Sequence, residues 1–344
     1  MRILKKLMVV ALAAASLAPL GAAWAQSAPE EVRFAWAGGP RTWVLGQIDK
    51  SFDKAFGVPV KWVAFNSGAD VLSLFAAKEI DIARFGSSPA AAGIARGLPI
   101  EVIGAQEIIA TSERLIARDG INSLKDLEGK RVAYPANSTA QFAFELAVKL
   151  AGDGADRSKI RTVALKPAEI VSAWQRGDID AAYVWGPFSQ QLEAAQGKEI
   201  FATKDLAEHG VLVFNNYVAR KEFAEQHPEL IVKFLQVAQD KANEYLADPE
   251  AASQKIAQYL DIPVDTVRST LGGLQYPSIQ EQLTVDYLGN SQTKADSRIT
   301  RSYHDAATFL ADIGELRASD VPATYADAIN TRYLEQAAAA APQQ

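Results

Sequence analysis

The chain has 344 residues, and its 41 acidic side chains outnumber its 35 lysines and arginines, which gives a formal net charge of −6. This acidic balance disfavours a nucleic-acid-binding protein and simple adhesion to anionic lipid. The sequence contains no cysteine, and this excludes disulfide bonds, thiol catalysis and cysteine-ligated metal.

The first 25 residues have the features of a secretory signal peptide. Three basic side chains surround the start of an apolar run rich in alanine, leucine and valine, and the sequence Ala-Trp-Ala at 23–25 has the small-x-small pattern of a cleavage site. A membrane-spanning helix is the alternative, but Pro19 and Gly21 lie within the run and disfavour it. We expect cleavage after residue 25, export to the periplasm, and a net charge of −9 for the mature protein.

Short β-branched runs alternate with helix-length amphipathic segments along the first part of the mature chain, which is typical of βαβ units. In the first unit we expect strands at 32–36, 58–65, 80–85 and 100–105, and helices at 43–56, 71–78 and 89–96. The pattern restarts after a turn-like stretch at 122–129. In the second unit we expect strands at 131–134, 161–165, 181–184 and 211–219, and helices at 141–150 and 168–176.

Helices dominate after residue 222, and a helical tail of this length must pack on the rest of the chain. We expect these helices at 228–246, 249–259, 263–271 and 298–313, the first three opening on a proline suited to the first helical turn. The sequence therefore predicts an α/β protein of two lobes with a cleft between them, each lobe a mixed sheet flanked by helices. Residues 26–115 with 220–335 are expected to form the first, discontinuous lobe, 116–219 the second lobe, and 336–344 a disordered tail.

Several expected helices begin with small polar residues directly after a strand. These residues are Ser67 and Gly68, then Gly86, Ser87 and Ser88, and then Ser138 and Thr139. Helix N-termini carry unpaired N–H groups and a partial positive charge, so several of them converging in one cleft would bind an anion. In open α/β sheets, ligands sit beyond the carboxyl ends of the strands, where these turns fall. The alternative is that each hydroxyl only caps its own helix.

Tryptophan and arginine side chains lie beside these turns. Trp36, Trp43 and Trp185 flank glycine–proline turns, and an aromatic face in a cleft can hold an alkyl chain or an ammonium group. Burial in the core is the alternative for each of them. Arg41 and Arg84 could pair with an anionic head group or form structural ion pairs.

The search for catalytic motifs is mostly negative. The histidines His209, His227 and His304 are far apart and lack the spacing of a helical zinc pair. There is no nucleophile elbow, Walker phosphate loop or dinucleotide-binding glycine fingerprint. We therefore expect no catalytic residue, no metal and no cofactor.

Four stretches, FNSGA at 65–69, FGSSP at 85–89, PIEV at 99–102 and AWQRGDIDAAYVWGP at 173–187, carry a family resemblance. The chain resembles the taurine-binding proteins of ABC importers over about residues 31–335, within the wider family that binds aliphatic sulfonates, nitrate and thiamine precursors. The resemblance implies the two-lobed type II periplasmic binding protein fold, no catalysis, and capture of taurine or a related small sulfonate for an inner-membrane ABC permease with its ATPase. It places Ser67, Gly68, Ser87, Ser88, Ser138, Thr139 and Trp185 around the ligand. We expect a monomer with no nucleic-acid partner.

The chain departs from this family at the position that would hold an ammonium group. Related taurine-binding proteins carry an aspartate on the strand that returns to the first lobe, whereas Asn215 stands here, and a neutral amide holds an ammonium less tightly. Glu113 on the other crossing strand could compensate, or the ligand lacks an amine. The loop at 38–43 and Arg84, where a smaller polar residue is usual, also leave the ligand open.

The alternatives are an amine-free alkanesulfonate, nitrate or a thiamine-precursor pyrimidine as ligand, or a periplasmic enzyme or sensory subunit in place of a transport protein. The full set of expected ligand contacts is Trp36, Trp43, Ser67, Gly68, Arg84, Gly86, Ser87, Ser88, Glu113, Ser138, Thr139, Trp185 and Asn215.

Overall fold

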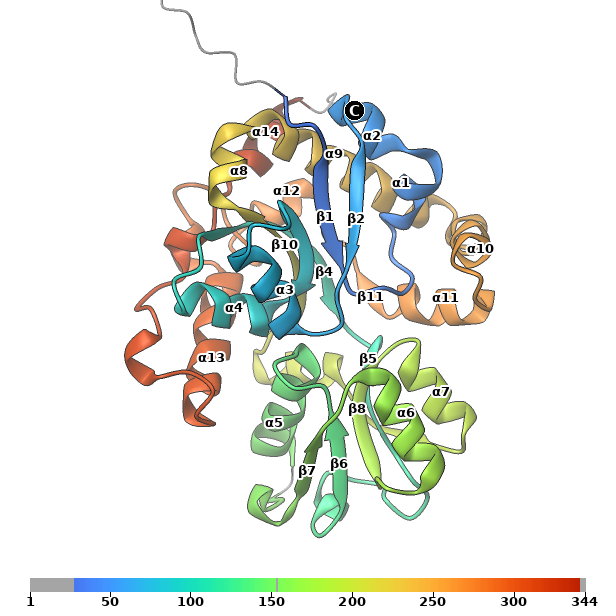
Figure 1. The fold of residues 1–344 in the computed structure, drawn as a ribbon. Coiled ribbons are helices and arrows are strands. Elements are labelled where there is room, and N and C mark those ends of the chain that lie inside the picture. Colours follow the sequence, from blue (N-terminus) through green and yellow to red (C-terminus); the bar gives the residue numbers. More distant parts are fainter. Residues whose placement is uncertain (1–27, 153, 341–344) are drawn as a thin grey trace, which may run out of the picture.

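The computed structural model describes residues 28–152 and 154–340 (Figure 1). The expected signal peptide, residues 1–25, lies outside the described residues. The described chain forms two β-sheets with helices on their faces, one sheet in the upper half of Figure 1 and the other in the lower half.

The first sheet has, within the described residues, six strands in the order β11-β4-β10-β3-β1-β2. β1 pairs in parallel with β2 and β3, whereas β10 runs antiparallel to both β3 and β4. The strands are β1 (Val32–Trp36), β2 (Val60–Ala64), β3 (Ile82–Gly86), β4 (Ile100–Ile109), β10 (Phe214–Arg220) and β11 (Leu274–Gln275).

The second sheet has five strands in the described part of the chain, in the order β7-β6-β8-β5-β9. The central strand β8 pairs in parallel with β6 and antiparallel with β5. The strands are β5 (Glu113–Ala117), β6 (Arg131–Tyr134), β7 (Arg161–Ala164), β8 (Ala181–Trp185) and β9 (Lys198–Ala202). β9 has no counterpart among the expected strands, and β5 was expected as the crossing strand of Glu113 but not from periodicity, because charged residues interrupt both short apolar runs.

The chain passes twice between the two sheets. It leaves the first sheet after Ile109 and enters the second at Glu113, and it returns between Ala202 and Phe214. The division expected at 115/116 and 219/220 therefore falls inside strands β5 and β10.

Helices before residue 200 follow the strands of both sheets. They are α1 (Val44–Asp49), α2 (Ser51–Phe56), α3 (Gly68–Ala76), α4 (Ser87–Ala95), α5 (Thr139–Ala151), α6 (Pro167–Arg176) and α7 (Phe188–Ala194). The single helix expected at 43–56 is two helices, because Lys50 between α1 and α2 adopts the left-handed conformation with φ of 58°.

Helices after residue 220 pack mainly against the first sheet and its helices. They are α8 (Lys221–Gln226), α9 (Pro228–Ala247), α10 (Pro249–Leu260), α11 (Val264–Gly272), α12 (Ile279–Gln282), α13 (Arg298–Asp312) and α14 (Arg332–Ala340). The expected disordered tail at 336–344 is wrong for residues 336–340, because α14 packs on α9 and buries Tyr333, Leu334 and Ala337. α13 lies against α4, and its Phe309 also reaches Phe142 of α5, with ring centroids 5.4 Å apart.

An aromatic cluster fills the core beside the first sheet. The rings of Trp43 and Trp62 stack with centroids 5.3 Å apart, and Phe34 of β1 meets both rings edge-on. Phe52 and Phe234 connect this cluster to α2 and α9. Such rings contribute large buried area, so the cluster anchors the flanking helices on the sheet.

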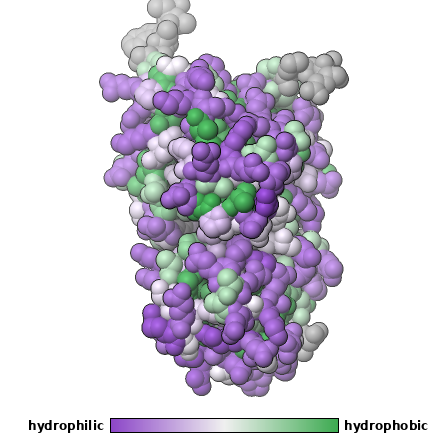
Figure 2. Space-filling model, turned by 90° about the vertical axis from the view of Figure 1, so that its right-hand side faces the viewer, coloured by the Kyte–Doolittle hydropathy of each residue, from purple (hydrophilic) through white to green (hydrophobic). Residues whose placement is uncertain are grey.

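The face shown in Figure 2 is mainly hydrophilic, with hydrophobic side chains in small scattered groups. None of the described helices combines the length and the apolar character needed to cross a bilayer.

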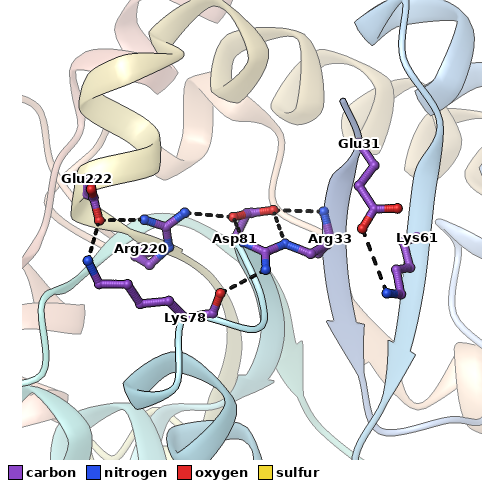
Figure 3. Close-up of polar contacts among 7 residues, drawn as sticks. All are labelled: Glu31, Arg33, Lys61, Lys78, Asp81, Arg220 and Glu222. Carbon is purple, nitrogen blue, oxygen red and sulfur yellow. Dashed lines mark hydrogen bonds and ion pairs between the residues drawn. The ribbon is translucent and has the colours of Figure 1, made fainter. Parts of the chain in front are cut away.

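Asp81, just before β3, is buried between two arginines (Figure 3). Arg33 of β1 donates to its two carboxylate oxygens over 2.6 and 2.9 Å, and Arg220 at the end of β10 donates over 2.8 Å. Burial by itself would raise the pKa of Asp81, but these hydrogen bonds outweigh burial and hold the pKa below its usual value. The carboxylate therefore ties β1, β3 and β10 together.

We expect Asp81→Asn to lower the free energy of unfolding by about 2–3 kcal/mol, because the buried hydrogen bonds from Arg33 and Arg220 lose their charged acceptor. Glu31→Gln is the matched control, because Glu31 pairs with Lys61 over 3.8 Å at an exposed position (Figure 3). That change should cost less than about 1 kcal/mol. Urea denaturation at neutral pH measures both variants, and equally small losses in the two would contradict the role given to Asp81.

Candidate functional site

A cavity of about 60 Å³ lies between the two sheets, at the carboxyl ends of their parallel strands. This is where open α/β sheets bind ligands. One water molecule needs roughly 10–15 Å³ of such space, so the cavity has room for a few waters or one small organic molecule. Its lining consists of Ala37, Gly38, Arg41, Phe65, Asn66, Ser67, Gly68, Arg84, Phe85, Gly86, Pro89, Ile109, Ser112, Glu113, Asn137, Ser138, Thr139, Trp185 and Asn215.

Three helices begin at this cavity. Ser67, Gly86 and Ser138 are the N-cap residues of α3, α4 and α5, and all three line it. The first N–H groups of an α-helix have no acceptor within the helix, and the helix dipole adds roughly half a positive charge at this end. The structure thus brings together the turns after β2, β3 and β6, in an arrangement that favours an anion.

Two glycines permit this close approach. A β-carbon at Gly86 would lie 2.6 Å from Cγ2 of Thr139, and one at Gly68 would lie 2.5 Å from the backbone oxygen of Asn137. Both contacts run from the first sheet to the start of α5 on the second sheet. A larger residue at either position would therefore push the two sides of the cavity apart.

The serine hydroxyls at the helix starts are already engaged by their own helices. Ser67 Oγ accepts from the N–H of Asp70 over 3.1 Å, and Ser138 Oγ accepts from the N–H of Gln141 over 3.2 Å. The capping interpretation thus holds for these two hydroxyls, while the first backbone N–H groups remain for a ligand. Ser87 and Ser88 do not line the cavity: both are buried, and their hydroxyls have no hydrogen-bond partner among the described residues.

The tryptophans divide between cavity and core. Trp185, at the end of β8, lines the cavity. Trp43 is 1% exposed and stacks on Trp62, so it belongs to the core. Trp36 contacts the Trp43 ring edge-on, because side chains two apart on β1 share a face and Phe34 of that face is buried in the aromatic cluster. We expected both Trp36 and Trp43 to contact the ligand, but neither side chain lines the cavity.

Two buried arginines share one carboxylate at the first-sheet side of the cavity. Arg84 donates to Glu107 Oε1 from Nη2 and to Gln106 over 2.8 Å, and Arg41 Nε lies 3.1 Å from the same oxygen of Glu107. Asn215 also donates to Glu107 Oε1 over 3.0 Å. Burial and the neighbouring Arg84 lower the pKa of Arg41 to about 10.

Glu113 faces the cavity from the second sheet, at the start of β5. Its Oε1 accepts from the hydroxyl of Thr139 over 2.6 Å, and its Oε2 has no partner among the described residues. Burial raises the pKa of Glu113 to about 7, in spite of the Thr139 hydrogen bond and the charges of Arg84 and Arg41. The group can therefore be neutral or charged near neutral pH.

Nine of the thirteen expected residues line the cavity, and four, namely Trp36, Trp43, Ser87 and Ser88, do not. Contact of the nine with a ligand stays a prediction. Arg41, Asn66 and Asn137 line the cavity without being in the expected set, although the two asparagines precede the same serine turns. Glu107 was also absent from the expected set. The sequence feature that could have indicated it is an acidic residue inside the apolar run of β4. Among the described residues, no group of three or more histidines and acidic side chains is placed to hold a metal ion.

Comparison with known proteins identifies a family, a relative with a similar sequence, and solved structures with a similar fold. The family described as NMT1/THI5 like matches residues 46–252. The taurine-binding periplasmic protein of Escherichia coli strain K12 is 32% identical over 297 residues, which cover 85% of this chain and 88% of that protein.

Two solved structures show how widely the fold is used. The alkanesulfonate-binding protein SsuA from Xanthomonas axonopodis pv. citri, bound to MOPS, has a TM-score of 0.73 at 18% identity and covers 89% of this chain and 99% of its own. The desulfurization enzyme DSZB has a TM-score of 0.60 at 13% identity and covers 90% and 99%. At these identities the similarities show the fold alone, and they confirm the predicted α/β architecture.

We expect Glu113→Gln to stabilise the ligand-free protein increasingly as the pH rises. In the unfolded chain this carboxyl titrates near 4.5, its usual value, whereas the folded protein holds the proton up to about pH 7. Between these values the unfolded state ionises first, so ionisation penalises the wild-type fold by up to about 3 kcal/mol. Urea denaturation from pH 5 to 8 should show the gap between the variants growing to pH 7 and then levelling, and parallel profiles would contradict the assigned pKa.

Proposed function

The chain belongs to the NMT1/THI5-like family and has the fold of the periplasmic binding proteins, and from this premise we propose that it captures a small organic sulfonate, taurine or a close relative, for an ABC importer. The observation that carries the proposal is the meeting of three helix N-termini and two arginines in one cavity. A sulfonate offers three acceptor oxygens and one negative charge, which match several converging N–H donors.

The lining supplies both parts of a sulfonate site. Backbone N–H groups at the starts of α3, α4 and α5 hold the sulfonate oxygens, while Phe65, Phe85 and Trp185 flank the carbon chain. These contacts need no hydroxyl to leave its capping role. Binding then depends on fixed dipoles that require little rearrangement when the ligand arrives.

The two sheets act as the cores of two lobes. Residues 28–109 with 214–340 form the first lobe, residues 113–202 form the second, and the segments 110–112 and 203–213 connect them. Besides the glycine contacts, Gln190 of α7 donates to Ser269 of α11 across the cleft over 2.9 Å. Hinge motion at the two connections opens and closes the cavity.

The proposal places the mature protein in the periplasm as a monomer, after cleavage of residues 1–25. It delivers its ligand to an inner-membrane permease with an ATPase. The names of the relatives support this location, and the acidic surface balance fits a diffusing carrier. The ligand leaves unreacted, and recovery of unchanged sulfonate after long incubation tests this against the enzymatic alternative that the DSZB fold raises.

A thermal-shift panel tests the ligand class. Taurine and ethanesulfonate should each raise the unfolding midpoint, since a ligand at 100 times its dissociation constant stabilises by about 2.7 kcal/mol. Nitrate and hydroxymethylpyrimidine, which lack a sulfonate, should give smaller shifts. A shift with the pyrimidine alone, or with none of the four compounds, would contradict the proposed function.

Gly86→Ala should weaken sulfonate binding at least about tenfold, because the added β-carbon meets Thr139 and hinders closure. Adding Thr139→Ser removes Cγ2 but keeps the hydroxyl that donates to Glu113. The double variant Gly86→Ala with Thr139→Ser should therefore recover affinity. Gly272→Ala is the control, since no atom lies within 4 Å of its β-carbon position. Isothermal titration calorimetry measures all variants, and undiminished affinity in Gly86→Ala alone would show that closure does not need this glycine.

A further inference from the structure

The first-sheet side of the cavity holds more positive charge than its carboxylate compensates. Arg41 and Arg84 both line the cavity, and their side chains are only 7% and 6% exposed. Glu107 is the acidic partner of both, and a single oxygen of it takes the contacts. Arg41 Nε lies 3.1 Å from that oxygen without hydrogen-bond geometry, so a buried N–H remains unpartnered within the described chain.

The opposite end of β3 shows that this is not a general feature of the protein's ion pairs. Asp81 also meets two arginines, but both of its oxygens accept hydrogen bonds. The Arg33 side chain is 26% exposed, and Arg220 has Glu222 as a second partner over 2.8 Å. Water and Glu222 therefore compensate the charge at that end. At the cavity end, Glu113 is the acidic side chain of the lining, but one of its oxygens is bound by Thr139 and burial raises its pKa to about 7, so an incoming anion can still supply negative charge.

We propose that the cavity selects a sulfonate that carries a second anionic group, a carboxylate on a short carbon chain, with the carboxylate bound by Arg41 and Arg84. The inference rests on the proposed function, because the sulfonate end occupies the helix starts as described above. Guanidinium groups match carboxylates in shape and charge, which suits this half of the cavity to that group.

The charges of the cavity agree with a dianion. Three helix N-termini contribute roughly half a positive charge each, and the cluster of Arg41, Arg84 and Glu107 contributes one more. With Glu113 protonated, this total of about two and a half positive charges is sufficient for the two negative charges of a sulfocarboxylate. An ammonium group would instead meet an uncompensated guanidinium, and Asn215 gives it only a neutral amide that already donates to Glu107.

Calorimetry with sulfoacetate, ethanesulfonate and taurine at pH 7 and low salt tests the inference. Sulfoacetate should bind at least about tenfold more tightly than either monosulfonate. Equal or weaker binding of sulfoacetate, with the other two still binding, would overturn this inference and leave the proposed function intact. Binding of none of the three would overturn the proposed function itself.

Arg41→Gln tests whether the arginine pair causes the preference for sulfoacetate. The variant should bind sulfoacetate and ethanesulfonate with affinities within about threefold of each other, so that the tenfold advantage of sulfoacetate disappears. Arg41→Lys, which keeps the charge, should retain at least part of the advantage. An unchanged preference in Arg41→Gln would overturn the assignment.

Proton uptake gives a measurement that needs no variant. Glu113 faces Thr139 of α5, Arg84 of β3, Arg41 of the loop before α1 and Glu107 of β4, and the hydroxyl of Tyr183 of β8 lies near it as well. A dianion nearby favours its protonated form, so sulfoacetate should take up protons on binding at pH 7, and its affinity should fall as the pH rises above 7. Calorimetry in buffers of different ionisation enthalpy measures this, and proton release with sulfoacetate would overturn the inference.

Discussion

Three helix N-termini can meet in one cavity only because Gly68 and Gly86 carry no β-carbon. The turns after β2 and β3 belong to the first sheet, and the start of α5 belongs to the second. A side chain at either glycine would meet Asn137 or Thr139 at less than a van der Waals distance. The electrostatic character of the cavity therefore depends on a packing constraint, because separated helix ends could not act on the same ligand.

Buried charge clusters lie near both ends of strand β3, and the surroundings give the two clusters different roles. Asp81 at one end uses both oxygens to join β1, β3 and β10. Solvent reaches Arg33, one of its two arginine partners. Glu107 of β4, which is level with the other end of β3, shares one oxygen between two arginines that water barely reaches. The first cluster is complete by itself and stabilises the fold. The second is complete only with an anion in the cavity, which links charge compensation to binding.

Much of the fold could be predicted from periodicity. The parallel strands β1, β3, β6 and β8 lie close to their expected ranges, because β-branched runs followed by amphipathic helices are a strong local signal. β5 and β9 could not be found in this way, since their charged residues are satisfied by partners far along the chain, such as Arg114 with Glu193 and Glu199. The split between α1 and α2 depends on the backbone conformation of one residue, Lys50, which no pattern of hydrophobicity reveals.

The sequence by itself determined that small polar turns follow parallel strands, and therefore that helix N-termini stand at the carboxyl edge of each sheet. The local chemistry of Ser67, Gly86 and Ser138 was sufficient for this, because capping involves only neighbouring residues. Only the tertiary structure decided which side chains beside those turns face the cavity. Trp43 stacks in the core and Arg41 lines the cavity although they are two residues apart, because that choice depends on Trp62 and Glu107, which come from distant strands.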